Sequence, residues 1–124
     1  MTEVFLLKDF AAPEKKAARL TVEVAVPLPI ENTFSYFLKP DQISRAKVGV
    51  RVRIPFKNRE TTGFLVRLSE TPSDQKLKEV IAIPDEEPVL NERTLRLTRW
   101  LAENYFSSWG EAIEAAVPAW VKKG

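Results

Sequence analysis

The alternation of apolar and basic residues across positions 49–56 constrains the fold of this chain more than any other feature. Val50, Val52 and Ile54 alternate with two arginines, which is the period of a β-strand with one buried face. Pro55 has no amide hydrogen, so the hydrogen-bonded ladder is expected to end there. The segment predicts a strand that carries positive charge on its exposed face and then enters a basic loop.

Four further segments have strand-like patterns and are separated by turn signals. They are Thr21 to Val26, Phe34 to Leu38, Thr62 to Leu68 and Lys76 to Ile83. Gly63 marks a bulge or a close backbone approach, and the alternation after Lys76 does not show which face is buried. About five short strands with regular turns predict a small antiparallel, barrel-like sheet.

The last third of the chain changes to a helical period. Asn91 is a good N-cap residue ahead of Leu97, Trp100, Leu101 and Tyr105, which recur at helical spacing. Residues 108–111, Ser-Trp-Gly-Glu, form a capping-box pattern that opens a second helix. Strands within residues 20–83 followed by two helices within residues 90–117 predict an α+β domain over residues 20–124. Residues 1–19 have little to bury and are expected to be a flexible extension.

Composition excludes several classes of function. The 124 residues include neither histidine nor cysteine, and no glycine-rich phosphate-binding motif occurs. We therefore expect no enzyme activity from this chain alone, no cofactor and no metal site. No segment approaches the ~20 apolar residues of a membrane span, and the apolar run from Val4 to Leu7 is too short for a signal peptide. The expectation is a cytoplasmic monomer.

Charge is distributed unevenly although the formal net charge is only +2. From Lys39 to Lys78 there are ten basic and four acidic residues, a net of +6. Five acidic residues then follow up to Glu92 with no base between them. Such asymmetry favours a surface that faces a polyanion, although the opposite charges could also pair with each other.

Phe34 and Tyr36 flank Ser35 and lie close in sequence to a turn rich in proline. Aromatic rings beside a basic strand can stack on unpaired bases of any kind. Aromatic residues two positions apart in a strand share a face, however, and that face is more often core. Both interpretations remain open from the pattern alone, and Ser35 is expected on the opposite, exposed face.

Several segments, taken in order, resemble the N-terminal DNA-binding domain of the bacterial replication-restart helicase PriA. They read Val-Ala-Val-Pro-Leu-Pro at 24–29, Thr-Phe-Ser-Tyr at 33–36, Gly-Val-Arg-Val-Arg-Ile-Pro-Phe at 49–56 and Gly-Phe-Leu-Val at 63–66. The likeness continues through Leu-Lys-Glu-Val at 77–80 and Glu-Pro-Val at 87–89 to Trp100, Tyr105 and Gly110-Glu111. It runs from about Leu20 to Gly124.

The resemblance implies a module that holds the 3′ end of the nascent leading strand at a stalled fork. The terminal nucleotide would lie in a pocket around Phe34, Lys57 and Lys78. Ser35 stands where the family has an aspartate that contacts the terminal base, and Lys57 stands where it has a glycine. If the backbone at Lys57 needs a positive φ, a lysine tolerates it less well than glycine.

The cations around that pocket would supply affinity that depends on salt and not on sequence. The DNA-binding residues expected are Phe34, Ser35, Tyr36, Arg51, Arg53, Lys57, Arg59 and Lys78. The partners implied are single-stranded 3′ ends, forked DNA, other primosome proteins and single-stranded-DNA-binding protein. The alternative is a protein-interaction module that docks an acidic partner, or another domain of its parent, through the basic face.

Overall fold

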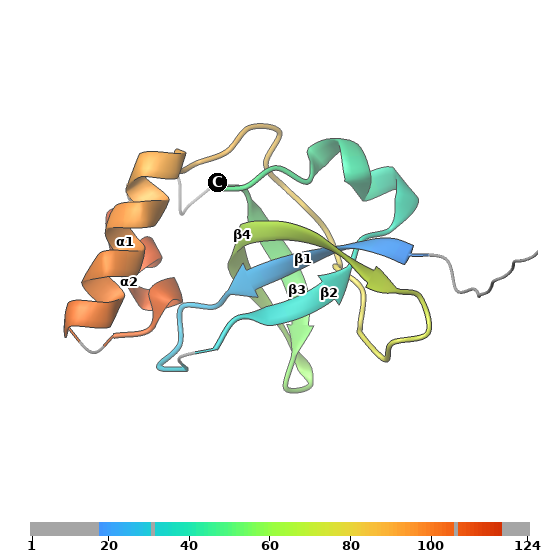
Figure 1. Cartoon of the computed structure of the whole chain (residues 1–124), viewed down its shortest axis with the longest axis horizontal. Coiled ribbons are helices and arrows are strands. Elements are labelled where there is room, and N and C mark those ends of the chain that lie inside the picture. Colours follow the sequence, from blue (N-terminus) through green and yellow to red (C-terminus); the bar gives the residue numbers. More distant parts are fainter. Residues whose placement is uncertain (1–17, 31, 106, 118–124) are drawn as a thin grey trace, which may run out of the picture.

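The computed structural model describes residues 18–30, 32–105 and 107–117. Its elements are β1 (Ala18–Ala25), β2 (Phe34–Phe37), a 3-10 helix (Pro40–Arg45), β3 (Arg51–Phe56), β4 (Arg59–Pro72), α1 (Glu92–Tyr105) and α2 (Trp109–Ala116). The predicted extension, residues 1–19, lies outside the described residues except for Ala18 and Arg19, which belong to β1. The strands precede the helices, so the predicted α+β class is confirmed (Figure 1).

The sheet has four antiparallel strands in the order β2-β1-β4-β3, one fewer than predicted. Residues 76–83 do not form the expected fifth strand. They make only two isolated bridges, from Glu79 to Phe37 in β2 and from Ala82 to Arg53 in β3. Because β2 and β3 are the two edges of the sheet, this one segment touches both of them. It gives the curved sheet its barrel-like closure.

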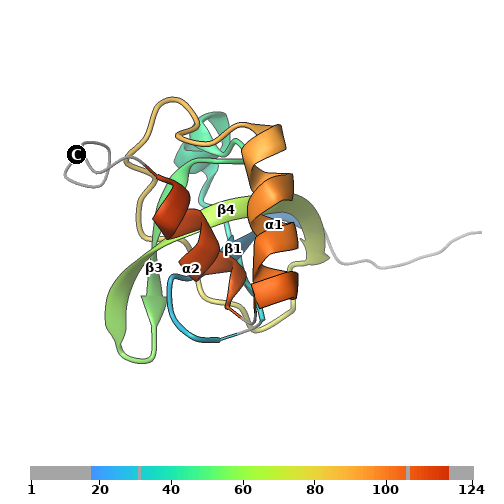
Figure 2. The ribbon, with the colours of Figure 1, turned by 90° about the vertical axis from the view of Figure 1, so that its left-hand side faces the viewer.

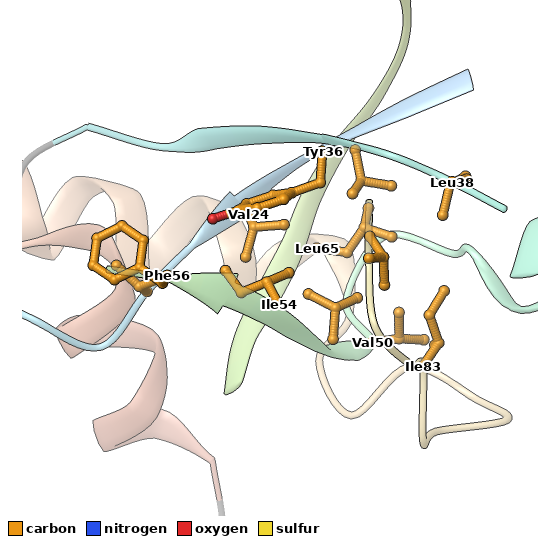
Figure 3. Close-up of a cluster of buried hydrophobic side chains, with 12 residues drawn as sticks. Val24, Tyr36, Leu38, Val50, Ile54, Phe56, Leu65 and Ile83 are labelled. Atoms are coloured by element: carbon orange, nitrogen blue, oxygen red, sulfur yellow. The ribbon is translucent and has the colours of Figure 1, made fainter. Parts of the chain in front are cut away.

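The core lies inside this curved sheet (Figure 3). Val50, Val52 and Ile54 are fully buried there, which confirms the face predicted from their alternation. The hydroxyl of Tyr36 donates a 3.0 Å hydrogen bond to the carbonyl oxygen of Pro55 and so connects the two edge strands. The predicted period of β3 therefore fixes which of its side chains point outward.

A β-bulge bends the central pair of strands. Glu23 pairs with Arg67, but the next residue, Val24, pairs with Leu65, so Val66 is extra in β4. At Gly63, a Cβ atom would lie 2.9 Å from the backbone carbonyl oxygen of Ala25 and would overlap a methyl carbon of Val24. The predicted close backbone approach at this glycine is confirmed.

Both helices begin at the predicted caps. The Asn91 side chain accepts a 2.8 Å hydrogen bond from the Thr94 amide, and the capping box of Ser108 and Glu111 is complete. The apolar residues whose spacing indicated this helix do not form its buried face: the buried residues of α1 are Leu95, Thr98 and Ala102, whereas Leu97, Trp100 and Tyr105 are exposed. No helix in the described ranges is long and apolar enough to cross a bilayer.

The helices lie together beside the sheet and bury a second, smaller core against it (Figure 2). Phe64 of β4, Leu95 of α1 and Ile113 of α2 belong to this core. At Gly110, a Cβ atom would overlap the carbonyl group of Val26, so α2 starts directly against the residue that follows β1. The far end of β3 and its turn remain uncovered by helices (Figure 1).

Candidate nucleic-acid interface

The turn between β3 and β4 has an unusual backbone. Phe56 pairs with Arg59, which leaves Lys57 and Asn58 as a two-residue turn. Their φ angles are 51° and 64°, the left-handed pair that matches the twist of a hairpin. Asparagine adopts this region readily, but lysine does not. The positive φ anticipated for a glycine at this position is therefore present, and Lys57 occupies it.

Phe34 and Lys57 both contact Phe56, although they come from opposite edges of the sheet. The rings of Phe34 and Phe56 pack edge to face with their centroids 4.9 Å apart. The Lys57 ammonium lies 5.5 Å from the centroid of the Phe56 ring. Phe34 is half-buried and Lys57 is exposed, so part of an aromatic ring and a cation share one surface. We call Phe34, Phe56 and Lys57 the hairpin cluster.

Lys78 lies at the other end of β2. Its carbonyl oxygen accepts a 2.9 Å hydrogen bond from the amide of Phe37. Phe37 is three residues from Phe34, about 10 Å along a strand. The side chain of Lys78 is exposed and makes no ion pair with any described residue. Two of the three predicted pocket residues thus contact the same ring, that of Phe56, and the third flanks the same short strand as Phe34.

Tyr36 lies in the core, where only 5% of its surface is exposed. Burial raises the pKa of its hydroxyl, which is bound to Pro55. Its ring has no face open to a base, so the core interpretation holds for this residue. Tyr36 supports the strand that presents Phe34.

Ser35 is exposed on the opposite face of β2, as predicted. Its cross-strand partner in β1 is Glu23. This carboxylate accepts a 3.1 Å hydrogen bond from the Thr33 hydroxyl and lies 3.6 Å from the guanidinium of Arg67. Sequence reasoning did not identify Glu23 as a neighbour of Ser35, because strand register, and not spacing along the chain, brings the two residues together.

Arg51 is engaged by Asp85, contrary to what a count of cations in the sequence suggests. Its guanidinium donates hydrogen bonds of 2.7 and 3.0 Å to the carboxylate, and its amide donates a third of 2.8 Å. Only 12% of the Arg51 side chain and 9% of the Asp85 side chain is exposed. Burial acts to raise the pKa of Asp85, but the hydrogen bonds and charge of Arg51 outweigh it and lower that pKa. The hydrogen bonds also raise the pKa of Arg51.

The acidic segment after Ile83 also forms two exposed ion pairs with the basic segment. Glu86 pairs with Arg45 at 3.5 Å, and Glu87 pairs with Lys47 at 3.4 Å. Near the turn the pattern differs: Arg53 contacts Glu60, while Arg59 has no ion pair with a described residue. Lys57 and Arg59 at the end of the hairpin, and Lys78 beside β2, are therefore exposed cations that remain available to a polyanion.

Comparisons with known proteins give one consistent family. A family model of PriA, described as the 3′DNA-binding domain (3′BD), matches residues 23–118. Replication restart protein PriA of Treponema pallidum (strain Nichols) is 31% identical over 104 residues, which are 79% of this chain and 16% of that protein. The Bacillus subtilis (strain 168) protein of the same name is 33% identical over 95 residues, 75% of this chain and 12% of that protein.

A probable replication restart protein PriA from Mycobacterium tuberculosis (strain H37Rv) is 31% identical over 91 residues, 73% of this chain and 14% of that protein. The chain spans between 12% and 16% of the length of these three curated relatives. The family model, by contrast, covers most of the chain, including β2, the hairpin and both helices. The chain belongs to the family of PriA 3′ DNA-binding domains.

Proposed function

We propose that this domain captures the free 3′ end of a single DNA strand, such as the nascent leading strand at a stalled fork. The observation that supports the proposal is the hairpin cluster, in which Phe34 and Lys57 both contact Phe56 although they come from opposite edges of the sheet. An aromatic edge beside a cation suits a nucleotide, because the ring contacts the base while the cation attracts phosphate.

Recognition of an end requires more than charge. A 3′-hydroxyl is distinguished from a continuing strand when polar groups bind it and a wall excludes the next phosphate. The tight turn at Lys57 and Asn58 supplies backbone polar groups beside Phe34, in a left-handed conformation fixed by the hairpin. Lys57, Arg59 and Lys78 add attraction to phosphate that does not depend on base sequence.

The experiment is polarisation binding of one labelled single strand with a 3′-hydroxyl, compared with the same strand carrying a 3′-phosphate. We expect markedly weaker binding of the strand with a 3′-phosphate, because that phosphate would clash with the wall that closes the site beyond the 3′-hydroxyl. Equal affinity for both strands would replace end capture with a general basic surface. Absence of binding to either strand would favour the protein-docking alternative.

Ser35→Asp tests whether Ser35 belongs to the site. A carboxylate there, next to Glu23 on β1, should change the preference among the four terminal bases. Ser44→Asp is the control, since it places the same new charge on the exposed surface of the 3-10 helix, outside β2. An unchanged base preference in Ser35→Asp would exclude Ser35 from the pocket.

We further propose that the domain targets a longer ATP-dependent helicase to forks, together with other primosome proteins and single-stranded-DNA-binding protein. The relatives are named replication restart proteins, and each is several times longer than this chain. The domain would supply the contact with the DNA end, while strand separation would belong to the remainder of the parent protein.

A further inference from the structure

Phe56 is the one member of the hairpin cluster that is not among the DNA-binding residues expected from the sequence. Only 7% of its surface is exposed, so its ring has little area open to a base. It lies at one end of the row of core side chains (Figure 3). It nevertheless contacts the two more accessible members of the cluster, Phe34 and Lys57. A buried ring in this place would act on a DNA end through those two side chains.

Backbone pairing holds the two edge strands together at some distance from the cluster. β2 and β3 are opposite edges of the sheet, and the segment 76–83 bridges to them at Phe37 and at Arg53. Each bridged residue is three residues along its strand from the cluster, which is about 10 Å. Closer to the cluster, the contacts between β2 and β3 in the described part of the chain involve side chains.

Two such contacts join β2 to β3 at this end. The hydroxyl of Tyr36 donates its hydrogen bond to the backbone carbonyl of Pro55, so this contact fixes the strands. The ring of Phe56 packs against the ring of Phe34 at an angle of 64° between their planes. Edge-to-face packing of this kind is a preferred geometry for two aromatic rings. The second contact therefore sets the orientation of the half-buried Phe34 ring, which would stack on a base.

The same Phe56 ring restrains Lys57. The backbone of Lys57 is fixed by the tight turn, with φ at 51°, but a lysine side chain has a flexible four-carbon stem. Its ammonium lies 5.5 Å from the centroid of the Phe56 ring, within the ~6 Å over which an aromatic ring attracts a cation. One buried ring thus restrains both the aromatic and the cationic side chain of the cluster.

We propose that Phe56 is a positioning residue for the DNA end. Its ring sets the spacing between the Phe34 ring and the Lys57 ammonium, and this spacing determines how strongly a strand with a free 3′-hydroxyl is preferred. A site that selects by fit requires its contact groups to be held within a fraction of an ångström by the side chains behind them. The inference rests on the proposed function of end capture.

A double-mutant cycle, measured by DNA binding, tests whether Phe56 acts through Phe34. Phe56→Leu keeps an apolar side chain in the core and removes the ring. It should weaken binding of a 3′-hydroxyl strand about fivefold in the otherwise unchanged protein, but less than about twofold in a Phe34→Ala background. Phe56→Met, whose flexible side chain fills irregular gaps in a core, is the second variant and should give the same result. Equal losses in both backgrounds would show that Phe56 only supports the fold, and would overturn the proposal.

The ratio of affinities for strands ending in a 3′-hydroxyl and in a 3′-phosphate gives a second readout. Phe56→Leu should reduce this ratio about fivefold. Ile54→Val is the matched control, because Ile54 is fully buried in the same strand and the same core, and its truncation destabilises the core without removing a ring. It should leave the ratio unchanged.

The outcomes separate this inference from the proposed function. A preference for the 3′-hydroxyl strand that is the same in Phe56→Leu as in the unaltered protein would overturn the positioning role and leave end capture intact. Equal binding of the two strands by the unaltered protein would overturn end capture, and the positioning role with it. A ratio that falls equally in Phe56→Leu and Ile54→Val would show that general loosening of the core, and not the ring, controls the preference.

Discussion

The two ends of β3 carry similar numbers of basic residues but differ in how the fold treats them. At the start of the strand, Arg51 is held by Asp85, and Lys47 just before it pairs with Glu87. At the other end, Lys57 is exposed on a two-residue turn, and Arg59 has no ion pair among the described residues. One end uses its charge to hold the chain together, while the other presents it to solvent.

This difference separates two roles that look alike in the sequence. A cation enclosed by a carboxylate contributes to folding, because separation would leave a charge without compensation. A cation at an exposed turn contributes little to folding but can attract a phosphate backbone. The basic band therefore consists of a structural part and a binding part, and the following changes act on one part or the other.

Asp85→Ala should have the largest effect, and it should act on stability. The change removes the carboxylate that accepts hydrogen bonds from the Arg51 amide and guanidinium at a largely buried site, so we expect a loss of about 3 kcal/mol in the free energy of unfolding. Urea denaturation measures this loss. The control is Glu86→Ala, which removes an exposed pair with Arg45 and should cost less than ~1 kcal/mol. Equal losses in the free energy of unfolding would show that the buried and the exposed ion pair contribute equally to stability.

The same ion pair predicts how stability depends on pH. Arg51 lowers the pKa of Asp85 in the folded protein, relative to about 3.9 in an unfolded chain. The stabilisation is therefore complete above the unfolded value and is lost as the pH falls through the folded value. In Asp85→Asn, the slope of unfolding free energy against pH below about pH 4 should be shallower. An unchanged slope would show that protonation of Asp85 does not cause the loss of stability at low pH.

Phe34→Ala should have the largest effect on DNA binding. Loss of one stacked base costs about 1–3 kcal/mol, so the affinity for a 3′-ended single strand should fall about tenfold. Tyr36→Phe is the matched control, because it keeps the buried ring and removes only the hydrogen bond to Pro55. It should leave DNA affinity nearly unchanged. Similar losses of affinity in both variants would show that Phe34 acts through the fold.

Lys78→Ala should reduce affinity more than Lys47→Ala does, although each removes one exposed lysine. Lys47 is already paired with Glu87, whereas Lys78 flanks β2 without an ion pair to a described residue. We expect a loss of about threefold for Lys78→Ala and a decrease of about 0.7 in the slope of log affinity against log salt. Equal slopes for the two variants would mean that total charge alone governs binding.

Lys57→Gly should have the smallest effect on stability, and a favourable one. The left-handed backbone costs a non-glycine residue about 1–2 kcal/mol, while glycine loses about 0.5–1 kcal/mol through its freedom in the unfolded chain. The net gain expected in urea denaturation is about 0.5 kcal/mol. Asn58→Gly should be closer to neutral, because asparagine tolerates this region. A loss of stability in Lys57→Gly would show that the lysine side chain stabilises the turn.

Local patterns predicted much of the fold. The alternation of Val50, Val52 and Ile54 identified the buried face of β3, and Asn91 and Ser108 identified the starts of both helices. These features depend on residues within a few positions of one another. The sequence pattern failed for residues 76–83, because the two bridges they make are decided by distant strand edges.

The candidate site was less accessible to such reasoning. The positive charge of Arg51 is visible in the sequence, but its neutralisation depends on Asp85, 34 residues further along the chain. The resemblance to the PriA family brought Phe34 and Lys57 into one proposal, and the structure places both against Phe56. The sequence pattern could not decide whether the Tyr36 ring is buried or exposed, because alternation in a strand is the same in both cases; the structure shows that the ring is buried.

The segment that closes the barrel has a consequence for how the domain folds and opens. The amide of Phe37 is bonded to Lys78, and the amide of Arg53 is bonded to Ala82. Both partners belong to the stretch 76–83, whose other backbone bonds also go to these two edge strands and to the side chains of Gln42 and Arg45. If that stretch detaches, two strand edges on opposite sides of the sheet become available for pairing with another chain at the same moment. A nascent chain that ends before residue 78 has both edges open, so synthesis must pass this stretch before the sheet is protected.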